Sequence, residues 1–118
     1  MKNIISDIKK CFSIETCYHG DRERWTPENP TTGHCAIASL LLHNLYGGTV
    51  CKTTVNRHTH YFNYFEDKVV DITAEQFGNV KINYDKYIIC NPKNMLKNKD
   101  VKERYDKLLE TFQTTQGG

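Results

Sequence analysis

Cys35 is the residue of this chain best placed for nucleophilic chemistry. It follows Gly33 in a breaker-rich segment and begins the run CAIASLLLHNLY, which is apolar almost all round and predicts a buried helix over 35–46. Free backbone N–H groups and a partial positive charge at a helix N-terminus stabilise a thiolate in the first turn. Cys35 is therefore a candidate nucleophile, with a small buried apolar residue as the alternative interpretation.

Two histidines could supply the base that a nucleophilic thiol needs. His58 and His60 enter a predicted strand, and Asp71 lies near the end of the next one. If the hairpin turns at Glu66 and Asp67, residue 60 lies diagonally across from residue 71 on the same face. We therefore predict His60 as the base and Asp71 as the group that orients it.

Each of these residues also has a structural interpretation. His58 shares the strand face of His60 and competes for the role of base. A strand histidine is more often packed or solvent-facing than catalytic, and Asp71 could instead cap a helix beginning near Thr73. The sequence favours His60 because His58 lies roughly 6.6 Å further along the strand, away from Asp71.

Stabilisation of a tetrahedral oxyanion requires donors near the thiol, such as its own backbone N–H and a side-chain amide. Asn29 precedes Cys35 by six residues. This interval resembles that between the oxyanion-hole amide and the nucleophile in papain-like enzymes. Because Asn29 is followed by Pro30, it also fits a turn former.

The elements that must position these residues are mixed α and β. Helical periodicity predicts flanking helices at about 2–16 and 98–112, and β-branched and aromatic runs predict strands at 49–55, 60–65, 68–73 and about 84–90. Residues 18–33 read as an irregular loop, and 73–77 as a short helix with Thr73 at its N-cap and Gln76 three residues later. We expect one domain over 1–113 and a disordered tail over 114–118.

Composition narrows the classes of function. The 118 residues carry a formal charge of only +2, so the composition does not indicate a large basic surface for binding nucleic acid. Residues 1–12 are charged and amphipathic, without the apolar core of a signal peptide or a membrane span, so we expect a cytoplasmic protein with no membrane partner. Five cysteines without a CxxC pair indicate neither a disulfide framework nor a zinc knuckle.

Four motifs, in order, carry a family resemblance: WTPENPTTGHCAIASLL, GG, HYFN and VDITAEQF, between about residues 25 and 77. Together they resemble the small bacterial YunG-like family, which looks like a minimal papain-like, transglutaminase-like α+β fold. The resemblance implies Cys35 as nucleophile, His60 as base, Asp71 as orienter and Asn29 as oxyanion helper. His34 departs from the family's usual Gly-Gln-Cys, which puts in doubt an amide contact beside the thiol.

The expected fold is thus papain-like α+β, with the helix from Cys35 packed on a small antiparallel sheet between terminal helices. The expected function is thiol-dependent hydrolysis of a peptide or amide, or deamidation or acyl transfer with the same groups, and no cofactor is required. The secondary site candidates are His34, His58, Asn63 and Trp25.

Two alternatives come from other classes of function. A binding or inhibitor protein could use the loop at 18–32, with Trp25 as an anchor for a partner protein. A transition-metal site could form from His58, His60, Cys35 and Asp71, although no ligand pair has the usual finger or knuckle spacing.

Overall fold

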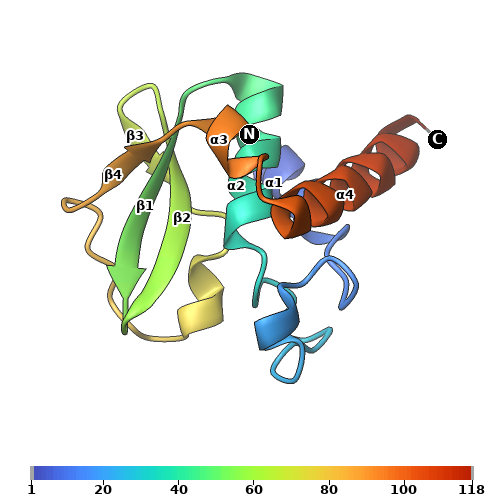
Figure 1. Ribbon diagram of the computed structural model, residues 1–118, viewed down its shortest axis with the longest axis horizontal. Coiled ribbons are helices and arrows are strands. Elements are labelled where there is room, and N and C mark those ends of the chain that lie inside the picture. Colours follow the sequence, from blue (N-terminus) through green and yellow to red (C-terminus); the bar gives the residue numbers. More distant parts are fainter. Residues whose placement is uncertain (1, 118) are drawn as a thin grey trace.

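The computed structural model describes residues 2–117 as a mixed α and β protein built around a four-stranded antiparallel sheet (Figure 1). The strand order is β3-β2-β1-β4, and each neighbouring pair is antiparallel. The four strands are β1 (Thr49–Val55), β2 (His58–Phe65), β3 (Lys68–Val70) and β4 (Ile88–Cys90). The α-helices are α1 (Lys2–Lys9), α2 (Cys35–Tyr46), α3 (Pro92–Met95) and α4 (Lys99–Gly117), and the 3-10 helices are η1 (His19–Asp21) and η2 (Ala74–Phe77).

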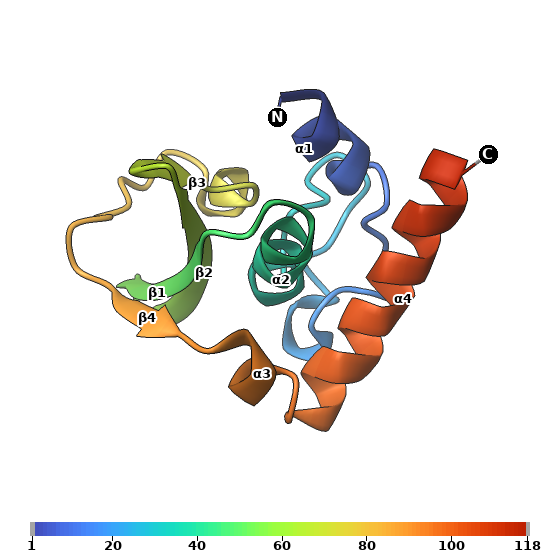
Figure 2. The same cartoon turned by 90° about the horizontal axis from the view of Figure 1, so that it is seen from above.

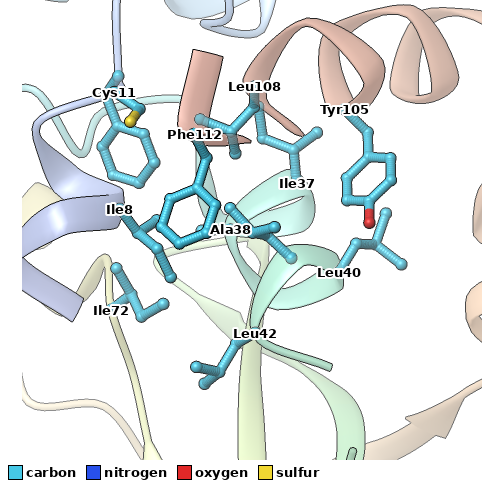
Figure 3. Packing of buried hydrophobic residues seen from close by; sticks show 12 residues of the cluster. Ile8, Cys11, Ile37, Ala38, Leu40, Leu42, Ile72, Tyr105, Leu108 and Phe112 are labelled. Carbon is cyan, nitrogen blue, oxygen red and sulfur yellow. The ribbon is translucent and has the colours of Figure 1, made fainter. Parts of the chain in front are cut away.

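Helix α2 lies at the centre of the molecule, between the sheet on one side and α4 on the other (Figure 2). Its buried residues join α1 and α4 in one hydrophobic cluster, in which Ile8, Ile37, Leu41 and Leu108 are fully buried. Figure 3 shows side chains from α1, α2 and α4 converging in this cluster. Burying a side chain of this size contributes roughly 1.5–3 kcal/mol. The N-terminus of α2, which carries Cys35, is therefore held by packing on both sides.

Two tight hairpins fix the register of the sheet. Asn56 and Arg57 connect β1 to β2, Glu66 and Asp67 connect β2 to β3, and all four residues have positive φ. Two consecutive residues with positive φ give a turn whose twist matches that of the flanking strands. The second turn pairs Asn63 with Val70, the register that the sequence analysis assumed.

Gly48 joins α2 to β1 with a φ of +76°, and a Cβ there would lie 2.5 Å from the carbonyl oxygen of Tyr64. Only glycine meets both requirements without strain. The Gly-Gly pair therefore ends α2 and lets β1 begin directly beside β2.

Several predicted boundaries were wrong. The first helix ends at Lys9 rather than near residue 16, because the following residues form turns in which the hydroxyl of Thr16 accepts from the backbone N–H of Ser13. Helix α4 continues to Gly117, beyond the predicted end at 112 and through residues 114–117 of the predicted tail, while residue 118 lies outside the described residues. The apolar periodicity stops at Phe112, but Thr111 and Thr115 continue the helix with hydroxyls bonded to carbonyls one turn earlier.

The short elements also differ from the prediction. Strand β3 ends at Val70 and β4 begins only at Ile88, so Asp71 and residues 78–87 belong to loops. Within residues 2–117, no helix combines the length and the apolar character needed to cross a membrane.

Candidate active site

Cys35 opens into a cavity of about 680 Å³ at the N-terminus of α2. The walls come from six parts of the chain: the start of α2, the β1–β2 turn, the first half of β2, η2, the segment 18–33, and α4. Besides Cys35, the lining includes His58 and Tyr61 from β2 and Gln76 and Phe77 from η2. β3 pairs only with the second half of β2, and η2, which follows it in the chain, packs the ring of Phe77 edge-on against that of His60.

The five thiols differ in accessibility. Cys35 and Cys90 are partly exposed, whereas Cys11, Cys17 and Cys51 are buried. Burial raises the pKa of the thiols of Cys11, Cys51 and Cys90, and it raises that of Cys17 to about 11. Cys35 lines the cavity, and Cys90 lies on the edge strand β4, which makes Cys90 a natural internal control.

His60 is completely buried and held by Asp71. Its Nε2 lies 2.6 Å from Oδ2 of Asp71, and the side chains are 0% and 4% exposed, respectively. This contact confirms the predicted diagonal pairing across the β2–β3 hairpin. Because an ionised carboxylate can only accept, Nε2 is the protonated ring nitrogen, and its N–H donates a hydrogen bond to Asp71. The other ring nitrogen, Nδ1, is then the one that can gain or lose a proton.

Three influences set the pKa of His60. Burial lowers it, but hydrogen bonding to Asp71 and to Cys35, together with their charges, outweighs burial and raises the pKa to about 9. The net direction means that this site favours an imidazolium beside negative charge.

Asp71 accepts hydrogen bonds from three parts of the chain. Its Oδ2 also accepts from the hydroxyl of Tyr84 at 2.7 Å, and its Oδ1 accepts from the backbone N–H of Thr73 at 3.2 Å. Asp71 does not cap η2, whose N-cap residue is Thr73; its bond to the backbone N–H of Thr73 closes a turn that leads into this helix. Burial and the bond to Asp71 raise the pKa of Tyr84, so its hydroxyl stays protonated as a donor.

Asn29 lines the same cavity as Cys35. Its Oδ1 lies 3.4 Å from the hydroxyl of Thr31, which donates to it. This contact directs the acceptor end of the amide toward Thr31 and leaves its Nδ2 to donate elsewhere. The structure thus places Asn29 on the cavity wall, and its role in binding an oxyanion remains a prediction.

The remaining secondary candidates fall in different places. His58 is exposed and lines the cavity next to the β1–β2 turn. Asn63 is buried, and its amide donates to the carbonyl of Ser39 at 3.0 Å, so it ties β2 to the middle of α2 rather than to the cavity. Trp25 is half-buried, and its indole N–H donates to the carbonyl of Pro30 at 2.9 Å, which closes the loop on itself.

Comparison with known proteins places this chain in a family. A family model described as "YunG protein" matches residues 1–117. The chain belongs to the YunG family. It is also 39% identical over 54 residues to a protein from Bacillus subtilis (strain 168) titled "Uncharacterized protein YunG"; the match covers 46% of this chain and 47%, about half, of that relative. The comparison with solved structures gave no match.

In this YunG-family protein, His34 points into the core rather than into the cavity. Its ring stacks on Phe12 with 4.3 Å between centroids. Its Nδ1 donates to the carbonyl of Thr32 at 2.9 Å, so Nε2, 2.7 Å from the hydroxyl of Thr16, is the acceptor. The residue next to Cys35 is therefore a buried, neutral histidine that fixes the segment leading into α2.

We expect His34 to make the fold sensitive to acid. Burial lowers the pKa of His34 to about 4, below the value of about 6.5 in an unfolded chain. Its contribution to stability is therefore complete above pH 6.5 and is lost as the pH falls toward 4, by roughly 2 kcal/mol at pH 4.5. In urea unfolding at pH 7 and pH 4.5, His34→Gln should lose less stability between the two pH values than the wild type. Equal losses would contradict this assignment.

Sequence reasoning missed Arg104, a buried cation in α4. Its guanidinium donates to the carbonyls of Thr16 and Gly33, bonds Asp100 through Nε at 2.9 Å, and lies 5.6 Å from the ring centroid of Tyr18. It thereby fastens the segment before Cys35 to α4. Its spacing from Asp100 identifies an ordinary helix ion pair, but nothing in the sequence indicates the contact to a loop 71 residues earlier.

The positions of the described residues do not support the alternative of a transition-metal site. Within residues 2–117, no three His, Cys, Asp or Glu side chains are grouped to hold a metal ion.

Proposed function

We propose that this YunG-family protein carries out thiol-dependent acyl chemistry on a peptide or amide, with Cys35 as nucleophile, His60 as base and Asp71 as its orienting group. One observation carries the proposal: a fully buried imidazole is hydrogen-bonded to a carboxylate through Nε2, and Gln76 and Phe77, which contact that imidazole, line the cavity into which Cys35 opens. A histidine with only a packing role needs neither a carboxylate partner nor an accessible thiol.

The reaction follows from these positions. His60 takes the thiol proton at Nδ1, and the sulfur of Cys35 attacks the carbonyl carbon, forming a C–S bond as the carbonyl electron pair moves to oxygen. The backbone N–H of Cys35 and the amide of Asn29 donate to this oxyanion. When the intermediate collapses, the C–N bond breaks and the imidazolium protonates the leaving amine.

The thioester that remains can follow two routes. Water, deprotonated by His60, hydrolyses it to a carboxylic acid and restores the thiol; an amine acceptor instead forms a new amide. Hydrolysis of a peptide, deamidation and acyl transfer therefore use the same groups. We include in the proposal a papain-like fold, supported by a nucleophile at the start of a helix that packs on an antiparallel sheet carrying the base on a strand.

The proposal is tested with p-nitrophenyl acetate, an activated ester that reports on acylation of a thiol without knowledge of the natural substrate. We expect release of p-nitrophenolate and a transient acetyl group on Cys35, located by peptide mass spectrometry. Cys90→Ala should react like the wild type, and Cys35→Ala should lose the fast phase. Acetylation of other residues alone, with Cys35 unmodified, would contradict the proposal and favour a binding module.

A further inference from the structure

Gln76 connects the two halves of the site. It lies in η2, and its Oε1 accepts from the backbone N–H of Gly33 at 3.3 Å, two residues before Cys35. Its Nε2 donates to the hydroxyl of Thr73 at 3.1 Å and lies 3.4 Å from Nδ1 of His60. One amide thus spans from the segment that leads into α2 to the imidazole on β2.

The direction of this amide is fixed by the groups around it. A backbone N–H can only donate, so the group that faces Gly33 must be Oε1. The amide nitrogen of Gln76 can only donate as well, and it therefore faces Nδ1 of His60 as a donor. Nδ1 accepts only when the ring is neutral and its proton is on Nε2, the nitrogen that bonds Asp71.

The backbone at Gly33 is fixed by its surroundings, so it does not move with the Gln76 side chain. Its φ is +76°, and a Cβ at this position would lie 2.5 Å from the sulfur of Cys17, so the chain can pass there only as glycine. The carbonyl of Gly33 accepts from Arg104 and from the backbone N–H of Tyr18. The Gly33 peptide is thus a rigid support, and Gln76 transmits its position to His60.

We propose that Gln76 is a positioning residue whose amide donor disfavours protonation of Nδ1 of His60 and aligns that nitrogen with the start of α2. This inference deepens the proposed function, since Nδ1 is the atom that would take the proton from Cys35. Gln76 opposes Asp71: the carboxylate favours the imidazolium, whereas the Gln76 amide favours the neutral base. A base that must both accept and release a proton requires such a balance.

The groups that act on His60 come from three sides. Asp71 follows β3 and carries the bond from Tyr84, Cys35 begins α2, and Gln76 and the ring of Phe77 cover His60 from η2, with Phe77 edge-on at 4.9 Å between centroids. Gln76 lies outside the proposed catalytic set, and its replacement by Glu changes the charge beside Nδ1 of His60 while keeping nearly the same shape.

Substitutions of Gln76 should raise the pH at which His60 is half-protonated, its protonation midpoint, by different amounts. Gln76→Glu keeps an acceptor for Gly33 but places a carboxylate where the donor was, and we expect the midpoint to rise by about one pH unit. Gln76→Met removes the donor without adding charge, and the rise should be smaller. The measurement is a pH titration of the His60 ring signals by NMR on the folded full chain.

The control is Gln113→Glu, the same charge change on an exposed residue of α4, which should leave the midpoint unchanged. A His60 midpoint that is the same in wild type, Gln76→Met and Gln76→Glu would overturn the inference. This outcome is independent of the proposed function, because the titration requires no reaction at Cys35. An inert Cys35 together with the ordered shifts would reject the function and leave the role of Gln76 intact.

Discussion

His60→Ala should lower the rate at which p-nitrophenyl acetate acylates Cys35 by a factor on the order of a hundred or more. The imidazole is the group that would take the thiol proton, and it is fully buried beside Asp71. Without it, the thiol must ionise unaided; an ordinary cysteine, with a pKa of about 8.5, is only a few per cent thiolate at pH 7. The measurement is the rate of the fast p-nitrophenolate phase at pH 7.

His58→Ala is the matched control for this prediction. His58 lies on the same strand and lines the same cavity, but it is exposed and has no carboxylate partner among the described residues. We expect its replacement to change the rate by only a few fold. If His58→Ala cost as much as His60→Ala, the assignment of the base would be wrong.

Asp71→Asn should lower the same acylation rate by a hundredfold or more, because an amide can donate to the imidazole and stabilise the wrong tautomer. The variant also removes the charge that raises the pKa of His60, so that burial dominates and the pKa falls. NMR titration of His60 beside the rate measurement tests both parts. Tyr84→Phe, which removes a donor to Asp71 but keeps the carboxylate, should have a smaller effect on both.

Stability gives an independent measure of the same pair. A histidine whose folded pKa of about 9 exceeds the unfolded value of about 6.5 stabilises the fold fully below pH 6.5, and this contribution is lost as the pH rises through 9. The difference in unfolding free energy between wild type and Asp71→Asn should therefore be largest near pH 6 and smaller at pH 9.5. A difference independent of pH would show that Asp71 stabilises the fold without acting on His60.

The contact between His60 and Asp71 was predictable because local rules determine it. Glu66 and Asp67 mark a two-residue turn, and the turn sets the register that pairs Asn63 with Val70. Asp71 is the next residue, and although β3 ends before it, its side chain still reaches His60. Cys35 at the start of a buried helix was predictable for the same reason, since the apolar run and the preceding breakers define that end.

The parts that sequence reasoning missed depend on contacts between distant loops. Gln76 reaches Gly33 across 43 positions, and Arg104 reaches the same peptide across 71. Tyr84, predicted as the start of a strand, instead lies in a loop, and it is this loop that brings its hydroxyl to Asp71. The position of His34 next to a candidate nucleophile suggests a chemical role, but both of its ring nitrogens form hydrogen bonds inside the core.

The reactivity of the five thiols toward iodoacetamide at pH 6 tests the central claim most directly. A thiolate held by imidazolium reacts at a pH where ordinary thiols are almost entirely protonated. Quantified by peptide mass spectrometry, alkylation of Cys35 should exceed that of Cys90, the other partly exposed thiol, by at least tenfold. Because burial raises the pKa of Cys90, the decisive comparison is His60→Ala, which should slow alkylation of Cys35 and leave that of Cys90 unchanged. Equal rates at Cys35 and Cys90 in the folded wild type, rising together with pH, would contradict the account.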